Sequence, residues 1–131
     1  MIRSLRIPLA LVLAVPLFAC TAKVDHVKQA QDFASQKKFQ EAIIEYRAAL
    51  KENDRNGAVR LALGDVYAEL GDGLNAFHEY VRASDLLPKS VDAQLKAGAV
   101  LLMAGQFKEA AARADRALRE EPCGLLLRLD E

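Results

Sequence analysis

The sequence predicts an all-α fold, an α-solenoid of about three helix-turn-helix units that follows an N-terminal signal helix. Three observations predict this fold. Small, aromatic and turn residues recur every 34 residues, each interval holds two runs of apolar residues at helical spacing, and glycine or proline separates the runs in the second and third intervals. Units with this period cannot bury their apolar faces alone, so they stack against their neighbours.

The first element is an N-terminal leader, residues 1–19. Arg3 and Arg6 precede a short uncharged apolar run that is interrupted by Pro8 and Pro16. A helix of this length covers roughly 20 Å, which is short of the roughly 30 Å hydrocarbon core of a bilayer. A positive start, a short apolar run and a small final residue are typical of a secretory signal peptide rather than a membrane span.

The leader ends in Leu17-Phe18-Ala19-Cys20, which resembles the lipobox of bacterial lipoproteins, although Phe18 stands where a small residue is usual. The resemblance implies that Cys20 becomes the acylated first residue of the mature chain, with residues 20–23 as its tether. Stable anchoring takes more than one acyl chain, because each buried CH₂ contributes only about 0.8 kcal/mol. An ordinary secretory signal that happens to end in a cysteine is the alternative.

Thr21 follows the cysteine where an aspartate would favour retention at the inner membrane. The resemblance therefore implies a lipid-anchored protein of the bacterial cell envelope, at the outer membrane and facing the periplasm. The covalent lipid on Cys20 is the only group that we expect on the chain, and no cofactor is expected. Loss of the leader removes two of the 18 basic residues and none of the 18 acidic ones, so the mature chain is nearly neutral. A near-neutral chain argues against nucleic acid as a partner.

The period divides residues 24–122 into three units, 24–56, 57–90 and 91–122. The positions that match at intervals of 34 residues include Ala42, Ala76 and Ala110; Ala49, Ala83 and Ala117; Gly64 and Gly98; Gly71 and Gly105; and Pro88 and Pro122. This regularity predicts two helices in each unit.

The second unit shows how the two helices meet at the turn Gly71-Asp72-Gly73. Gly64 and Tyr67 share one stripe of the first helix, and Tyr80 lies on the facing stripe of the second. Small residues let the helices approach, while the tyrosines fill the space beside them. Pro88 ends the second helix because proline has no N–H and restricts the residue before it.

These positions resemble the tetratricopeptide repeat (TPR) over about residues 24–122. The third unit matches through Ala97-Gly98, Leu101, Gly105, Phe107, Ala110, Ala117-Leu118 and Pro122, and the second through Leu63-Gly64, Tyr67, Gly71, Ala76, Tyr80, Ala83 and Pro88. The first unit departs from the pattern, with Lys37 in place of the turn glycine and Asp54 in place of the proline. Such departures suit a terminal unit whose outer face meets water.

Residues 123–131 stand where the pattern would open a fourth unit. They are too few for a stable isolated helix and lack a polar cap. We therefore expect an irregular tail, a truncated fourth repeat of a longer array, and an apolar strip left uncovered on the helix predicted over residues 107–120. Cys123 is a candidate for intermolecular oxidation, and an accident of the irregular tail is the simpler interpretation.

No arrangement of side chains indicates catalysis or metal binding. His26 and His78 lie far apart in the sequence, and neither has other ligands at metal-binding spacing. The glycines of residues 71–73 belong to a helix–helix turn rather than a phosphate loop. The sequence therefore predicts no enzyme activity, no metal site and no small-molecule substrate. The alternative is the repeat portion of a longer envelope enzyme or glycan-processing protein whose catalytic domain is absent from this sequence.

The candidate binding surface is the concave face of the stack. In TPR proteins the first helix of each unit lines this face, which implies a groove formed by Val27, Gln31, Leu61, Asp65, Glu69, Leu95, Leu102 and Met103. The basic and asparagine residues with which some relatives clamp a peptide carboxylate are not matched, because most of these positions hold Val27, Gln31, Ala62 and Asp92, with Lys96 as the one cation. This argues against chaperone-tail recognition and favours an amphipathic helix or an extended segment with apolar anchors. The simpler interpretation is that several of these residues only pack between repeats.

A lipobox joined directly to tandem repeats resembles the TPR lipoproteins of the bacterial envelope, among them those of the exopolysaccharide-associated PEP-CTERM sorting system. The resemblance implies a membrane-anchored scaffold for protein–protein interactions in envelope assembly, secretion or exopolysaccharide-associated protein sorting. Its partners would be proteins or peptides of the cell envelope.

Overall fold

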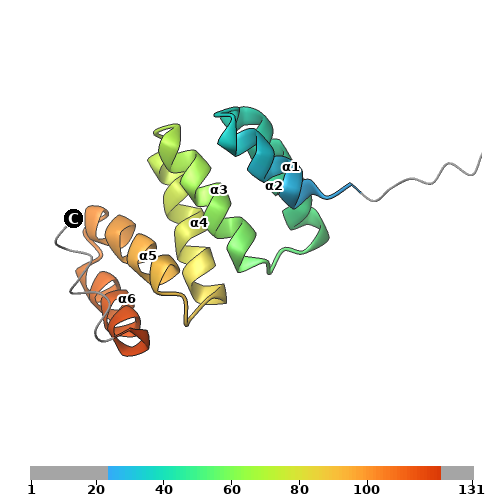
Figure 1. Ribbon diagram of the computed structural model, residues 1–131. Helices are drawn as coiled ribbons and strands as arrows, with labels where there is room; N and C mark the ends of the chain where they lie inside the picture. The colour runs from blue at the N-terminus through green and yellow to red at the C-terminus, as the bar shows by residue number, and fades with distance from the viewer. Residues whose placement is uncertain (1–23, 122–131) are drawn as a thin grey trace, which may run out of the picture.

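The computed structural model describes residues 24–121, which form six α-helices and no strand. The helices are α1 (His26–Ser35), α2 (Phe39–Glu52), α3 (Gly57–Glu69), α4 (Gly73–Leu86), α5 (Val91–Met103) and α6 (Phe107–Glu120). They pair as α1–α2, α3–α4 and α5–α6, and the three hairpins stand side by side (Figure 1). The all-α solenoid of three helix-turn-helix units is thereby confirmed. The predicted signal helix, Cys20 and the tail lie outside the described residues.

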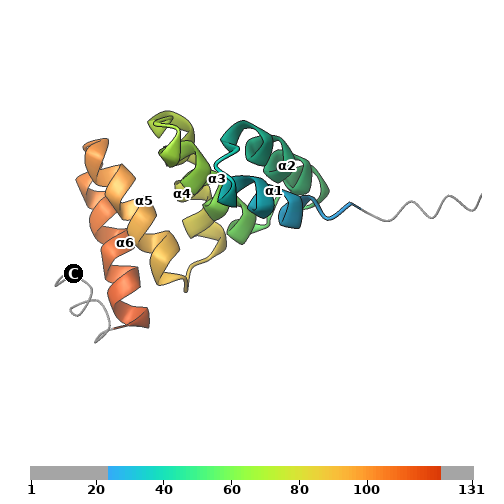
Figure 2. The same cartoon turned by 45° about the horizontal axis from the view of Figure 1, so that its top comes forward.

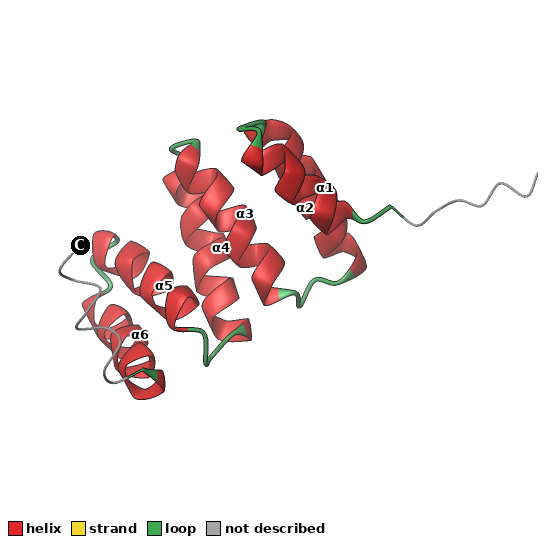
Figure 3. Ribbon diagram, viewed as in Figure 1, coloured by secondary structure: helices red, strands yellow, loops and turns green. Residues whose placement is uncertain are grey.

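The stack advances because the second helix of one unit packs against the first helix of the next. α2 contacts α3, and α4 contacts α5. Turning the molecule shows the same order of hairpins (Figure 2), and loops join helices at both ends of the hairpins (Figure 3). Within the described residues, no helix is long and apolar enough to cross a membrane.

Polar side chains cap the first helix of every unit. The caps are Asp25 for α1, Asn56 for α3 and Ser90 for α5, and each accepts a hydrogen bond from a backbone N–H in the first helical turn. Asp72 caps α4 in the same way. These bonds satisfy N–H groups that have no partner inside the helix.

The turn within each unit needs a left-handed residue. Gly71 and Gly105 have φ angles of 74° and 75°, and Lys37, at the equivalent position of the first unit, has a φ of 58°. This conformation destabilises an L-residue by about 1–2 kcal/mol, whereas glycine adopts it without that cost. The repeat therefore keeps the geometry of the turn even where the sequence has lost the glycine.

The core runs along the stack, with small residues where helices cross. Ala42 and Ala76 are buried, and Leu63 and Leu101 are only 1% exposed. Gly64 lies against the ring of Tyr80 so closely that an added Cβ would stand 2.7 Å from two ring carbons. This close approach requires glycine at residue 64.

Candidate binding groove

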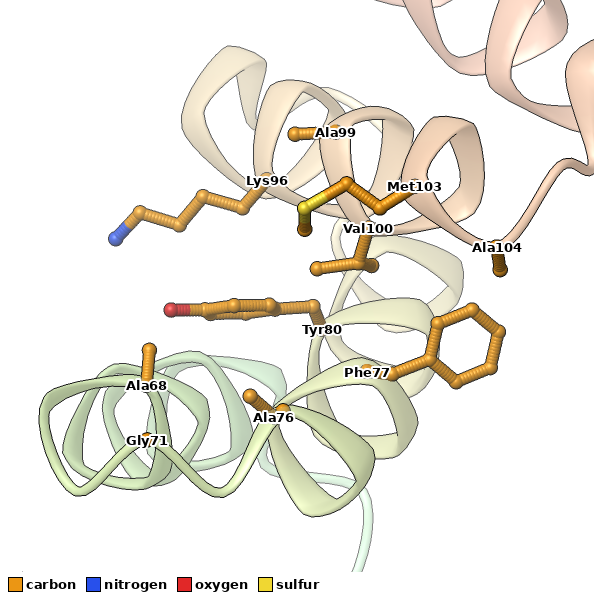
Figure 4. A pocket seen from close by; sticks show the side chains of 11 residues that line it. Ala68, Gly71, Ala76, Phe77, Tyr80, Lys96, Ala99, Val100, Met103 and Ala104 are labelled. Carbon is orange, nitrogen blue, oxygen red and sulfur yellow. The ribbon is translucent and has the colours of Figure 1, made fainter.

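A hollow of about 600 Å³ opens between the second unit and α5. Its lining is almost entirely apolar and comes from Ala68, Gly71, Gly73, Ala76, Phe77, Tyr80, Lys96, Ala99, Val100, Met103 and Ala104. Tyr80 lies across its middle, between Ala68 and Ala76 on one side and Val100 and Met103 on the other (Figure 4). We call this hollow the groove.

A polar network borders the groove where α3 meets α5. The hydroxyl of Tyr80 donates to Asp65 Oδ1 at 2.8 Å, and the Lys96 ammonium donates to both carboxylate oxygens of Asp65 at 2.7 and 2.9 Å. Lys96 Nζ also lies 3.3 Å from Asp92 Oδ2 and 5.8 Å from the centre of the Tyr80 ring. The network joins the second unit to the third and fixes Tyr80 in place.

The electrostatics of the network favour a neutral tyrosine and a charged lysine. Burial and the hydrogen bond to Asp65 raise the pKa of Tyr80, and the negative charges of Asp65, Asp92 and Glu69 raise it further. Burial alone lowers the pKa of Lys96, but the hydrogen bond to Asp65 and the charges of Asp65 and Asp92 outweigh it and raise the pKa overall. The lysine therefore stays positive, with its charge directed at two carboxylates.

Two of the eight predicted groove residues lie at the groove. Met103 lines it and is 79% exposed, and Asp65 belongs to the bordering network. Glu69 is exposed, and its charge acts on Tyr80.

The other five predicted residues lie elsewhere. Leu61 is half-buried against the core, and Gln31 is exposed on α1. Val27 lines a separate hollow beside the start of α1. Leu95 and Leu102 line a third hollow, on the outer side of the α5–α6 hairpin. None of these five residues lines the groove.

Residues of the second helix were missing from the sequence-based prediction. Ala76, Phe77 and Tyr80 of α4 line the groove together with the first helices. The pairing of Gly64 with Tyr80, already visible in the sequence, indicated that Tyr80 lies across the first helix. The pattern predicts packing between the two helices, and the structure shows that the same ring also faces the groove.

The histidines have ordinary surroundings. His26 Nδ1 lies 2.6 Å from Glu45 Oε2 and ties α1 to α2, while His78 is exposed beside Phe77. Residues 24–121 contain no group of histidine, cysteine or acidic side chains placed to hold a metal ion.

Stacked helical hairpins with a side-chain-lined groove define the class of helical-repeat proteins. The family model for the tetratricopeptide repeat matches residues 27–88 and 70–122. The chain therefore belongs to the tetratricopeptide repeat family, whose members serve as protein–protein interaction scaffolds.

Solved structures share the fold. They include the first TPR of Spaghetti (RPAP3) bound to the HSP90 peptide SRMEEVD, which is 21% identical, with a TM-score of 0.65 over 76% of this chain and 79% of that one. The Arabidopsis OM64 TPR domain is 26% identical, with a TM-score of 0.63 over 74% and 80% of the two chains. The MamA protein is 22% identical, with a TM-score of 0.68 over 74% of this chain and 53% of its own. No curated protein matches the sequence.

Proposed function

We propose that this chain is a membrane-anchored TPR scaffold that holds protein segments of the bacterial cell envelope in the groove between α3, α4 and α5. The observation that carries the proposal is the groove itself, an apolar hollow of about 600 Å³ with a fixed polar border. Such a surface takes the apolar anchor of an amphipathic helix or extended segment.

The border selects the charge of the partner. Asp65 and Asp92 are 45% and 54% exposed at their side chains, and Glu69 is also exposed. Lys96 already donates to Asp65 and lies close to Asp92, so the border keeps an excess of negative charge. The partner segment therefore carries an apolar anchor next to a basic residue. This chemistry differs from the acidic HSP90 peptide SRMEEVD that the RPAP3 domain binds.

The envelope location rests on the leader sequence. Leu17-Phe18-Ala19-Cys20 has the lipobox pattern, and only residues 21–23 separate Cys20 from the described part of the chain. Three residues reach roughly 10 Å at about 3.3 Å per residue, so the stack would stand close to the lipid headgroups. Partners that assemble at the periplasmic face of the outer membrane, in assembly, secretion or exopolysaccharide-associated sorting, are within its reach.

Capture of partners by cross-linking in membranes tests the groove. Met103→Glu places a charge in the apolar lining, whereas Ile44→Glu makes the same change at an exposed residue of α2 that does not line the groove. We expect the Met103 variant to lose the envelope proteins that the unchanged chain captures, and the Ile44 variant to keep them. Capture of the same proteins by both variants contradicts the proposal.

The intact mass of the mature chain tests the anchor. We expect a chain that begins at Cys20 and carries covalent acyl groups, and a Cys20→Ala variant that leaves the membrane fraction. A mature chain that begins at another residue and carries no lipid would reject membrane anchoring while leaving the groove untouched.

A further inference from the structure

A row of apolar residues runs along the exposed side of α6, the helix that ends the stack of described helices (Figure 1). The row consists of Phe107, Ala111, Ala114 and Leu118, and all four are exposed. Their spacing of four, three and four residues places them on one face of the helix. Phe107 is 67% exposed and Leu118 is 42% exposed. We call these four residues the stripe.

The stripe has the same order of side-chain sizes in both directions. A large residue stands at each end, Phe107 and Leu118, and the small residues Ala111 and Ala114 lie between them. When two copies of α6 pack antiparallel about the midpoint of the stripe, Ala111 lies level with the partner's Ala114, and Phe107 lies level with the partner's Leu118. Alanines at the centre let the helices approach closely, and spacings of three and four residues interlock as in a coiled coil.

Two charged residues flank one side of the stripe. Lys108 and Asp115 each follow a stripe residue directly, and they lie seven residues apart on the same flank. The opposite flank holds Ala110 and Ala117, which are buried where α6 packs against α5. Lys108 and Asp115 are exposed, and neither forms an ion pair with another residue among residues 24–121.

These charges match those of a second antiparallel copy. The arrangement places Lys108 opposite the partner's Asp115, and by symmetry Asp115 opposite the partner's Lys108. The stripe and its flank are therefore complementary to themselves in both size and charge, which is what an interface between two identical surfaces requires.

We propose that the stripe is the interface of a symmetric dimer, in which α6 of one chain packs antiparallel against α6 of a second chain. The stripe extends over roughly 17 Å of helix. The contact is therefore small, and the dimer forms only at high protein concentration. None of the four stripe residues lines the groove, so this proposal does not depend on the groove.

The second unit lacks this symmetry at the same positions. The residues 34 positions before the stripe are Gly73, Phe77, Tyr80 and Ser84. The first three line the groove, across from α5, and Ser84 is fully buried. The flank positions hold Leu74 and Val81, which carry no charge. The order of sizes and the pair of charges therefore belong to the third unit alone and are not part of the repeat pattern.

A head-to-tail contact between two chains fits the stripe less well. It would place the outer side of α1 of one chain on α6 of the other, and that side is polar at three positions where α3 is apolar. These are Asp25, Gln29 and Asp32, which correspond to Val59, Leu63 and Val66 and are all exposed. Burying such polar groups against an apolar surface is unfavourable.

Sedimentation equilibrium of the full chain tests the dimer. Reductant keeps Cys20 and Cys123 from joining two chains through a disulfide. Over a range of about 5 to 500 µM we expect reversible association from monomer to dimer. A chain that stays monomeric over the whole range overturns the proposal, because a second copy then does not cover the stripe.

Charge substitutions test the antiparallel arrangement. Lys108→Asp turns both ion pairs of the dimer into like-charge pairs and should raise its dissociation constant roughly tenfold. This residue lies in the first turn of α6, where a negative charge is favourable, so the variant keeps its fold. Arg116→Asp makes the same change of charge on the opposite side of α6 and should change the dissociation constant by less than about twofold.

The double variant Lys108→Asp/Asp115→Lys exchanges the two charges and should restore the dissociation constant of the unchanged chain. Equal effects of Lys108→Asp and Arg116→Asp overturn the proposal, and so does a double variant that dimerises no better than Lys108→Asp. A dimer that all four chains form equally is held by another part of the chain and overturns it as well.

Discussion

The second and third units share one backbone plan but differ in what fills the space between their helices. In the second unit the ring of Tyr80 lies against Gly64, where an added Cβ would come within 2.7 Å of it. In the third unit Ala114 takes the place of that tyrosine, and a Cβ on Gly98 would meet its nearest atom at 3.5 Å. The repeat thus sets the backbone of both units, while the side chain at one position, Tyr80 or Ala114, determines whether the space beside the glycine of the first helix is filled.

The largest expected effect on stability comes from removing the Tyr80 side chain. Tyr80→Ala removes a ring that is 7% exposed, together with its hydrogen bond to Asp65, and should lower the free energy of unfolding by about 3–5 kcal/mol. Phe107→Ala removes an aromatic ring that is 67% exposed and should change it by less than about 0.5 kcal/mol. Urea unfolding measures both, and similar losses for the two variants would show that Tyr80 is not a core residue.

The two glycines should respond to alanine with opposite signs. Gly64→Ala forces the Tyr80 ring to move and should destabilise the chain by about 1–3 kcal/mol. Gly98→Ala meets only ordinary contacts inside a helix and should stabilise it by about 0.5–1 kcal/mol, because alanine is the better helix former. Shifts of the urea midpoint in the same direction would contradict the difference between the two units.

The turns extend the comparison to the first unit. Lys37→Gly relieves a left-handed lysine and should stabilise the chain by about 1 kcal/mol, whereas Gly71→Ala introduces the same strain and should destabilise it by a similar amount. Thermal unfolding should show Tm rising for the first substitution and falling for the second. A fall of Tm in both variants would mean that the Lys37 side chain stabilises the fold by more than its left-handed backbone destabilises it.

The smallest expected effect is a loss of stability at alkaline pH that originates in Tyr80 and Lys96 at the border of the groove. The folded chain holds the pKa of both Tyr80 and Lys96 above their ordinary values of 10.0 and 10.5. Groups with a raised pKa stabilise the fold below the ordinary value, and this stabilisation is lost as the pH rises beyond it. The urea midpoint should therefore fall above pH 10, and less steeply in Asp65→Asn. If the urea midpoint fell with pH equally in the unchanged chain and in Asp65→Asn, Asp65 would not contribute to the raised pKa values of Tyr80 and Lys96.

The sequence was sufficient for the helices and their order because the features that set them are local. The turn at Gly71, the stop at Pro88 and the alanines at helix crossings all act within one hairpin. The lining of the groove was harder to predict, because it depends on the relative orientation of neighbouring hairpins. Leu61 packs against the core, and Leu102 lines the hollow on the outer side of the α5–α6 hairpin, although both residues lie on first helices. The left-handed turn at Lys37 follows only from the backbone that its neighbours impose.

The central claim is that partners bind at the groove rather than elsewhere on the stack. A photo-cross-linking amino acid placed at Met103 of the full chain tests it most directly, with the same group at Ile44 as the matched exposed site. The groove predicts a discrete cross-linked product from Met103 and none from Ile44. Products of equal yield from both sites, or a product from Ile44 alone, would contradict it.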